Sequence, residues 1–170
     1  TNVAIGSIAI GVSAGAAITS GACNVMIGAC AGKAMTLGLN NVFIGRQVAE
    51  GITTEVVDDS IAIGRQALLG SSSTTGDGNI ALGIQAICAI TTGLSNIALG
   101  TTAMDALTSG CCNVAIGVNA LGVATSGNLN VGIGYRALGD GVATGINNIG
   151  IGSDSGKDLT TGRGNIAIGE

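Results

Sequence analysis

The amino-acid sequence predicts an all-β fold, a parallel β-solenoid of about nine coils with 17 to 19 residues each. Three observations lead to this prediction. A five-residue pattern (a small polar residue, Val or Ile, a variable residue, Ile or Leu, then Gly) recurs ten times at nearly constant spacing. Gly supplies 31 of the 170 residues. Charged residues make up only 9% of the chain, which disfavours helical repeats because these need longer units rich in Leu, Glu and Lys.

The ten copies of the pattern mark the successive coils. They begin at Ser7, Asn24, Asn41, Ser60, Asn79, Asn96, Asn113, Asn130, Asn148 and Asn165. The second position is always Val or Ile and the fourth always Ile or Leu. Because alternate side chains of a strand face the same way, we expect these two columns to line the interior. The invariant Gly at the fifth position predicts a tight corner or a positive φ.

The remainder of each unit predicts a return path to the next strand. Three residues after the corner Gly, Ala is usual and an apolar residue often follows, as in Ala67 and Leu68, which predicts a second, shorter strand. Segments such as Thr108–Gly110 have turn composition. One coil alone cannot offset an ordering cost of about 1 to 2 kcal/mol per residue, so stability must come from stacking. We expect one domain, residues 1–170, in which residues 1–6 add an extra N-terminal strand.

The third, variable position of the pattern predicts a self-association face. If the second and fourth positions point inward, the third points outward, yet no copy has a polar side chain there. An outward apolar column is expected to be covered by a partner. Its residues are Ala9, Met26, Phe43, Ala62, Ala81, Ala98, Ala115, Gly132, Gly150 and Ala167.

Composition argues against several functions. The formal net charge is −4, with one Tyr, one Phe and no Trp, so no basic stripe or stacking platform predicts nucleic-acid binding. No apolar run approaches the roughly 18 to 20 residues of a membrane-spanning helix, so no membrane insertion is expected. The chain has no His and no nucleophile–base pair, and we expect no catalytic, cofactor or metal site. Gly132, Gly134 and Ala137 match a dinucleotide fingerprint, but the repeat explains them.

Charged residues cluster in one of the longer units. Glu55, Asp58 and Asp59 lie in a loop that is expected to be solvated, with Ca²⁺ binding as the alternative. Arg46 and Arg65 occupy one column in adjacent coils, so their like charges need carboxylates or water, and the acidic loop is a candidate source.

The cysteines are expected to be small space-filling residues rather than a disulfide framework. They are Cys23, Cys30, Cys88, Cys111 and Cys112. Cys23 and Cys112 occupy one column five coils apart, roughly 24 Å at a strand spacing of about 4.8 Å. A disulfide needs Cα atoms within about 7 Å. Bonds between chains remain the alternative.

The repeat resembles that of a known family. The segments Asn113-Val-Ala-Ile-Gly-Val-Asn-Ala-Leu and Thr125-Ser-Gly-Asn-Leu-Asn-Val-Gly-Ile-Gly-Tyr-Arg-Ala-Leu are similar to the repeats of phage and giant-virus tail-fibre proteins. They also resemble the head repeats of YadA-like trimeric autotransporter adhesins, although the units here are longer. The resemblance implies a left-handed parallel β-roll with three chains side by side, located outside the cell, on a cell surface or on a virion.

The expected function is therefore that of a non-enzymatic structural fibre segment. Its expected partner is itself, as a homotrimer or as an end-to-end filament joined by the terminal strands. The alternative is an adhesin head or tail-fibre module that binds a host-surface receptor or glycan. An ice-binding face is disfavoured because adjacent hydroxyl residues such as Thr91 and Thr92 face opposite ways on a strand.

Overall fold

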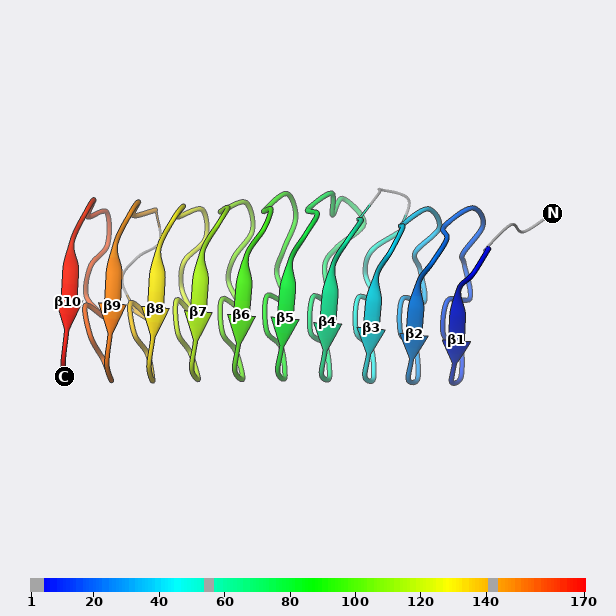
Figure 1. Ribbon diagram of the computed structural model, residues 1–170, viewed down its shortest axis with the longest axis horizontal. Helices are drawn as coiled ribbons and strands as arrows, with labels where there is room; N and C mark the ends of the chain where they lie inside the picture. Colours follow the sequence, from blue (N-terminus) through cyan, green and yellow to red (C-terminus); the bar gives the residue numbers. More distant parts are fainter. Residues whose placement is uncertain (1–4, 54–56, 141–143) are drawn as a thin grey trace.

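The computed structural model describes residues 5–53, 57–140 and 144–170. It shows a parallel β-solenoid, in which ten short strands form one sheet in chain order (Figure 1). The strands are β1 (Ile8–Ile10), β2 (Val25–Ile27), β3 (Val42–Ile44), β4 (Ile61–Ile63), β5 (Ile80–Leu82), β6 (Ile97–Leu99), β7 (Val114–Ile116), β8 (Val131–Ile133), β9 (Ile149–Ile151) and β10 (Ile166–Ile168). The predicted fold class is confirmed.

Equivalent positions of the repeat are aligned from coil to coil. Ile97 of β6, for example, pairs with Ile80 of β5 and with Val114 of β7, all in parallel. Figure 1 shows the strands side by side along the long axis, with the loops that follow them along one edge of the sheet and the loops that precede them along the other. Each column of the sequence repeat therefore becomes a row parallel to the long axis.

The predicted second strand of each coil is not formed. The residues after the corner Gly lie in turns, and two of them in most coils have positive φ, as in Gln66 (59°) and Leu68 (48°). A strand requires negative φ, so this alternation curls the backbone instead of extending it. Hydrogen bonds between coils persist here, since the N–H of Leu68 donates to the carbonyl oxygen of Ala86 at 2.9 Å.

The predicted orientation of the strands is wrong, because the third column faces the interior. Met26 and Phe43 are completely buried. The residues assigned to a self-association face are Ala9, Met26, Phe43, Ala62, Ala81, Ala98, Ala115, Gly132, Gly150 and Ala167, and all are buried except those in the first and last strands. Ala9 and Ala167 are more exposed because each has a neighbouring coil on one side only. These side chains cannot form an outer surface.

Size complementarity explains why the third column is apolar and mostly small. The residue six positions later is also buried, and the two share a thin interior. Phe43 is followed by Ala49, whereas Ala98 is followed by Met104. A Cβ added to Gly132 would lie only 2.8 Å from the backbone oxygen of Ala137. Small residues in this column therefore reflect a close-packed, dry coil rather than a partner surface.

The first column of the repeat forms a buried amide ladder. Asn96 shows the pattern: its backbone N–H and its Nδ2 both donate to Oδ1 of Asn79, each at 3.0 Å. Nδ2 also donates to the carbonyl oxygen of Gly110 at 2.8 Å. Asn113 in turn donates to Oδ1 of Asn96 through its backbone and its side chain. The ladder thus satisfies buried polar groups from coil to coil wherever the first position is Asn.

Ser60 interrupts this ladder, and replacing it with Asn is expected to stabilise the protein. The N–H of Ser60 donates to Oδ1 of Asn41, and its hydroxyl accepts from the N–H of Asn79 and donates to the carbonyl oxygen of Asp58, but no side-chain amide here continues the ladder. The S60N variant is expected to add about 1 kcal/mol to the free energy of unfolding, because it restores one buried hydrogen bond. Thermal denaturation followed by circular dichroism measures this effect. The S60A variant should be less stable than the unmodified chain, and S60N falling to the level of S60A would contradict the prediction.

Candidate self-association surface

The second and fourth columns of the repeat form one outward face of the sheet, here called the aliphatic face. Every side chain in it is Val, Ile or Leu, and the alternation that buries the third column places them outside. Exposure in inner strands reaches 37% to 40% for Ile61, Ile63 and Ile116. The members are Ile8, Ile10, Val25, Ile27, Val42, Ile44, Ile61, Ile63, Ile80, Leu82, Ile97, Leu99, Val114, Ile116, Val131, Ile133, Ile149, Ile151, Ile166 and Ile168.

The aliphatic face is long, flat and continuous. Because the strands pair in register, its side chains form two straight rows, and nine strand spacings of about 4.8 Å make the rows about 43 Å long. Single exposed apolar residues are ordinary on a protein surface, whereas a contiguous patch of this kind marks an interaction site. The flat shape suits another flat surface rather than a small ligand, which needs a concave site.

Two rows of exposed and partly exposed residues border the aliphatic face. The carboxyl edge consists of the residue after each corner Gly, and it includes the exposed Val12 and Tyr135. The amino edge consists of the two residues before the first position of each copy, and it includes the exposed Ile5 and Leu129. The two edges lie on opposite sides of the strands, since one follows and the other precedes each strand.

Both edges carry charges that have no ion-pair partner within the described part of the chain. The carboxyl edge holds Arg46, Arg65 and Glu170, and the amino edge holds Asp58, Asp59, Asp77 and Arg163. The ion pairs that the described residues do form lie elsewhere: Lys33 with Glu50 at 3.7 Å, and Arg136 with Asp140 and Asp154. Among the described residues, Asp58 and Asp59 of the acidic loop therefore form no ion pair with Arg46 or Arg65.

Hydrogen bonds hold the carboxylates of the amino edge in place. Oδ1 of Asp58 accepts the N–H of Leu39 at 2.7 Å, and Oδ1 of Asp77 accepts the N–H of Asp58 at 2.9 Å. Oδ1 of Asp59 accepts Nδ2 of Asn40 at 3.1 Å. Each carboxylate is thus fixed at the border of the aliphatic face through its Oδ1 atom.

The described residues give no support to the alternative of a Ca²⁺ site in the acidic loop. No group of three or more His, Cys, Asp or Glu side chains in them is arranged to hold a metal ion. Glu55, which completes the acidic cluster of the sequence, lies outside the described residues.

All five cysteines are free thiols. Cys23 and Cys112 are exposed on the amino edge, so the expectation that the cysteines fill interior space is wrong for these two. Cys88 is half-buried, and burial together with the nearby Asp105 carboxylate raises the pKa of its thiol. Burial raises the pKa of Asp105 as well. Cys88 is therefore a poor nucleophile, because the thiolate is the reactive form.

Threonine hydroxyls reinforce the stacking of the coils. Oγ1 of Thr91 donates to the carbonyl oxygen of Thr108 at 2.9 Å, and Oγ1 of Thr108 donates to that of Thr125 at 2.9 Å. Thr19 and Thr36 make the equivalent bonds earlier in the chain. These hydroxyl groups thus donate hydrogen bonds from one coil to the next, which explains the recurrence of Thr in this column.

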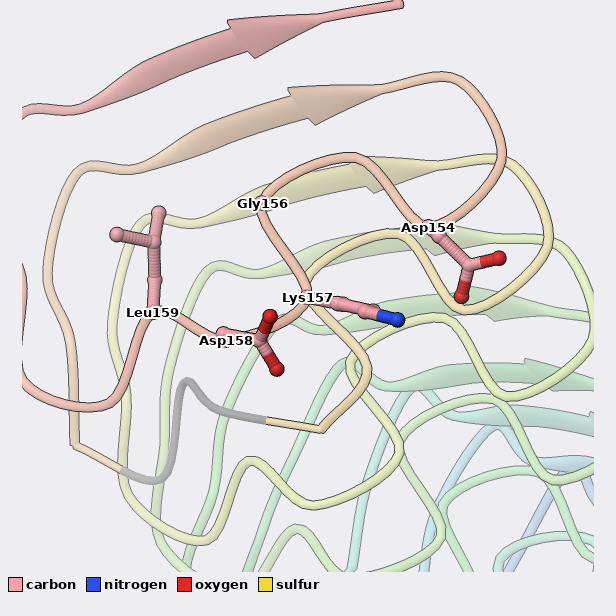
Figure 2. Close-up of a pocket in the computed structure, with 5 residues that line it drawn as sticks. All are labelled: Asp154, Gly156, Lys157, Asp158 and Leu159. Carbon is pink, nitrogen blue, oxygen red and sulfur yellow. The ribbon is translucent and has the colours of Figure 1, made fainter. Parts of the chain in front are cut away.

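A hollow of about 310 Å³ lies in the coil between β9 and β10. Asp154, Gly156, Lys157, Asp158 and Leu159 line it, and Figure 2 shows Lys157 extending toward the side of Asp154 while Leu159 lies on the opposite side. Oδ1 of Asp154 accepts no hydrogen bond but lies 3.4 Å from Nη1 of Arg136, an ion-pair distance. These side chains include no nucleophile with an adjacent base, so the hollow lacks the arrangement of an acyl-transfer or hydrolytic site.

The architecture defines the chain as a β-solenoid repeat protein with one exposed aliphatic sheet face. Comparisons with protein-family models, with curated proteins and with solved structures each gave no match. Within the part of the chain that the structure describes, no helical segment has the length and hydropathy needed to cross a membrane.

Proposed function

We propose that this chain is a non-enzymatic structural segment of a rigid fibre, outside the cell or on a virion, and that its copies associate side by side through the aliphatic face. One observation carries the proposal: twenty aliphatic side chains, without a single polar one, cover the outward face of the sheet. The resemblance of the repeat to fibre proteins agrees with this assignment and supplies the expected location. The surface differs from the third column that the sequence pattern suggested.

The packing preferences of parallel sheets support a covering partner. Purely parallel sheets normally have both faces covered. Here the coil interior covers one face, and the other presents Val, Ile and Leu to solvent. Flat sheets pack face to face at about 10 Å through interdigitating aliphatic side chains, so a second sheet of the same kind fits this surface.

The dimensions of the surface are those of a stable interface. The aliphatic face is about 43 Å long, and with its two edges it is at most about 20 Å wide, because six residue steps separate Asp59 from Arg65. The resulting footprint of at most roughly 860 Å² is comparable with the approximately 800 Å² that each partner contributes to an interface of standard size. Ladders of hydrogen bonds along the axis provide the rigidity that a fibre needs.

The test introduces charge into the centre of the aliphatic face. The double variant I97K/L99K changes two outward residues of β6, and it is expected to weaken self-association at least about 100-fold because the lysines would have to be desolvated. Sedimentation velocity over a range of concentrations measures the association and the number of copies. The control V123K changes an aliphatic residue that is even more exposed, at 41%, but lies away from this face, and it should leave association unchanged.

Two results would overturn the proposed function. The unmodified chain could remain monomeric at every concentration reached, or V123K could weaken association as much as I97K/L99K does. Thermal denaturation of each variant, followed by circular dichroism, establishes that a loss of association is not a loss of the fold.

A further inference from the structure

At two levels of the solenoid, the residue on the carboxyl edge and a residue on the amino edge of the same strand carry opposite charges. Arg65 follows β4 on the carboxyl edge, whereas Asp58 and Asp59 precede the same strand on the amino edge. At β10 the signs are reversed, with Glu170 after the strand and Arg163 before it. None of these five side chains forms an ion pair with another described residue of the chain. Six coils, roughly 29 Å, separate the two levels.

We infer that these edge charges pair between copies of the chain, Arg65 with Asp58 or Asp59 and Glu170 with Arg163, and that they select parallel, in-register association. The inference rests on the proposed self-association through the aliphatic face and specifies its geometry. When copies are related by rotation about an axis parallel to the solenoid, the carboxyl edge of one copy meets the amino edge of the next. Strand β4 then lies beside β4, and β10 beside β10.

Uncharged positions of the two edges agree with the same arrangement. Val12 and Ile5, which follow and precede β1, are both exposed and aliphatic. Tyr135 and Leu129, which follow and precede β8, are both exposed and apolar as well. Parallel, in-register copies therefore place apolar residues against apolar residues at β1 and β8 and opposite charges together at β4 and β10.

Other arrangements lose this agreement. An antiparallel pair that overlaps along all ten strands brings like edges together and sets β4 against β7, so Arg65 would face Val118 rather than a carboxylate. A parallel pair shifted by one coil can bring Arg46 near Asp58 or Asp59 and Arg65 near Asp77, but Glu170 and Arg163 then no longer meet and one coil at each end of the pair loses its cover. The unshifted arrangement leaves Arg46 and Asp77 opposite uncharged residues, but it alone pairs Glu170 with Arg163 and overlaps all ten strands of the aliphatic face.

A charge-reversal cycle tests the pairing at β10. The single variants R163E and E170R place like charges together and are each expected to raise the dissociation constant about tenfold at low salt, while the double variant R163E/E170R restores it. At high salt the differences should disappear, because exposed ion pairs are screened. The V123K variant is again the control for a change of surface charge away from the interface.

Zero-length cross-linking tests the orientation and the register directly. In the R65K variant, a carbodiimide is expected to join the new ammonium to Asp58 or Asp59 of another copy, and mixing isotopically labelled with unlabelled chains identifies the bond as intermolecular by mass spectrometry. Within one chain the two positions are about 20 Å apart along the strand, beyond the reach of a zero-length bond. The R163K variant should likewise be joined to Glu170.

The outcomes distinguish this inference from the proposed function. If the chain associates, but the double variant fails to restore affinity and the cross-links join other residues, the inference fails while the proposed function stands. If the unmodified chain does not associate at all, both fail.

Discussion

Replacing Gly100 with alanine is expected to destabilise the centre of the solenoid by about 4 kcal/mol. Gly100 is the corner after β6, its φ is +142°, and a Cβ there would lie 2.5 Å from the carbonyl oxygen of Gly117 in the next coil. Two costs add: backbone strain of about 1 to 3 kcal/mol at a φ that L-residues avoid, and about 1 to 3 kcal/mol for forcing the coils apart. Hydrogen exchange across β5 to β7 and chemical denaturation measure the loss.

A matched control separates the two costs of this substitution. Gly169 occupies the same column and also has a positive φ, +115°, but a Cβ there would meet nothing within 4 Å. The G169A variant should therefore show only the smaller, conformational part of the effect. Equal destabilisation by G100A and G169A would mean that backbone strain alone, and not the contact between coils, requires Gly at the corner.

Replacing Asn96 with leucine is expected to cost about 3 kcal/mol or more. The substitution keeps the approximate size of the side chain but removes the donor to Gly110 and the acceptor for both the backbone and side-chain N–H groups of Asn113. Each buried polar group left without a partner costs about 1 to 3 kcal/mol. Chemical denaturation gives the change, and loss of protection at the amide of Asn113 in hydrogen exchange gives its position.

Asn165 provides the control for the ladder. It donates to Oδ1 of Asn148 at 2.9 Å, but it is only partly buried and its own Oδ1 accepts no bond from a further coil among the described residues. The N165L variant should cost clearly less than N96L. Were N96L tolerated as well as N165L, the ladder would not be a major source of stability.

Much of the fold was predictable from the spacing of the pattern alone. Ten recurrences of an aliphatic pair followed by Gly predict ten stacked strands with equivalent positions aligned, and the structure confirms this register. The predicted second strand failed because positive φ at non-glycine residues such as Gln66 and Leu68 leaves no clear mark in the sequence. Residue type predicts such a conformation only weakly when neighbouring coils stabilise it through hydrogen bonds.

The interaction surface was placed on the wrong side of the strand for a related reason. Alternation identifies two sets of side chains, but where both sets are apolar it does not say which set is inside. Two signals in the sequence favoured the correct assignment. Asn at the first position has the same parity as the third, and a column of stacked Asn side chains can be buried because the amides bond to one another. Phe43 with Ala49 against Ala98 with Met104 shows the exchange of volume that a shared interior requires.

The sequence by itself determined the solenoid, its strand register and the corner glycines, because these depend on local spacing that each coil repeats. The tertiary structure alone decided which face of the strand is buried, since the buried face depends on how the turns fold back over the strand. It also placed Arg65 and Glu170 on one edge of the aliphatic face, with Asp59 and Arg163 on the other. Closure of the coil is a long-range property, and it buries the mostly small residues of the third column. The exposed contact surface is therefore formed by the Val, Ile and Leu residues of the second and fourth columns.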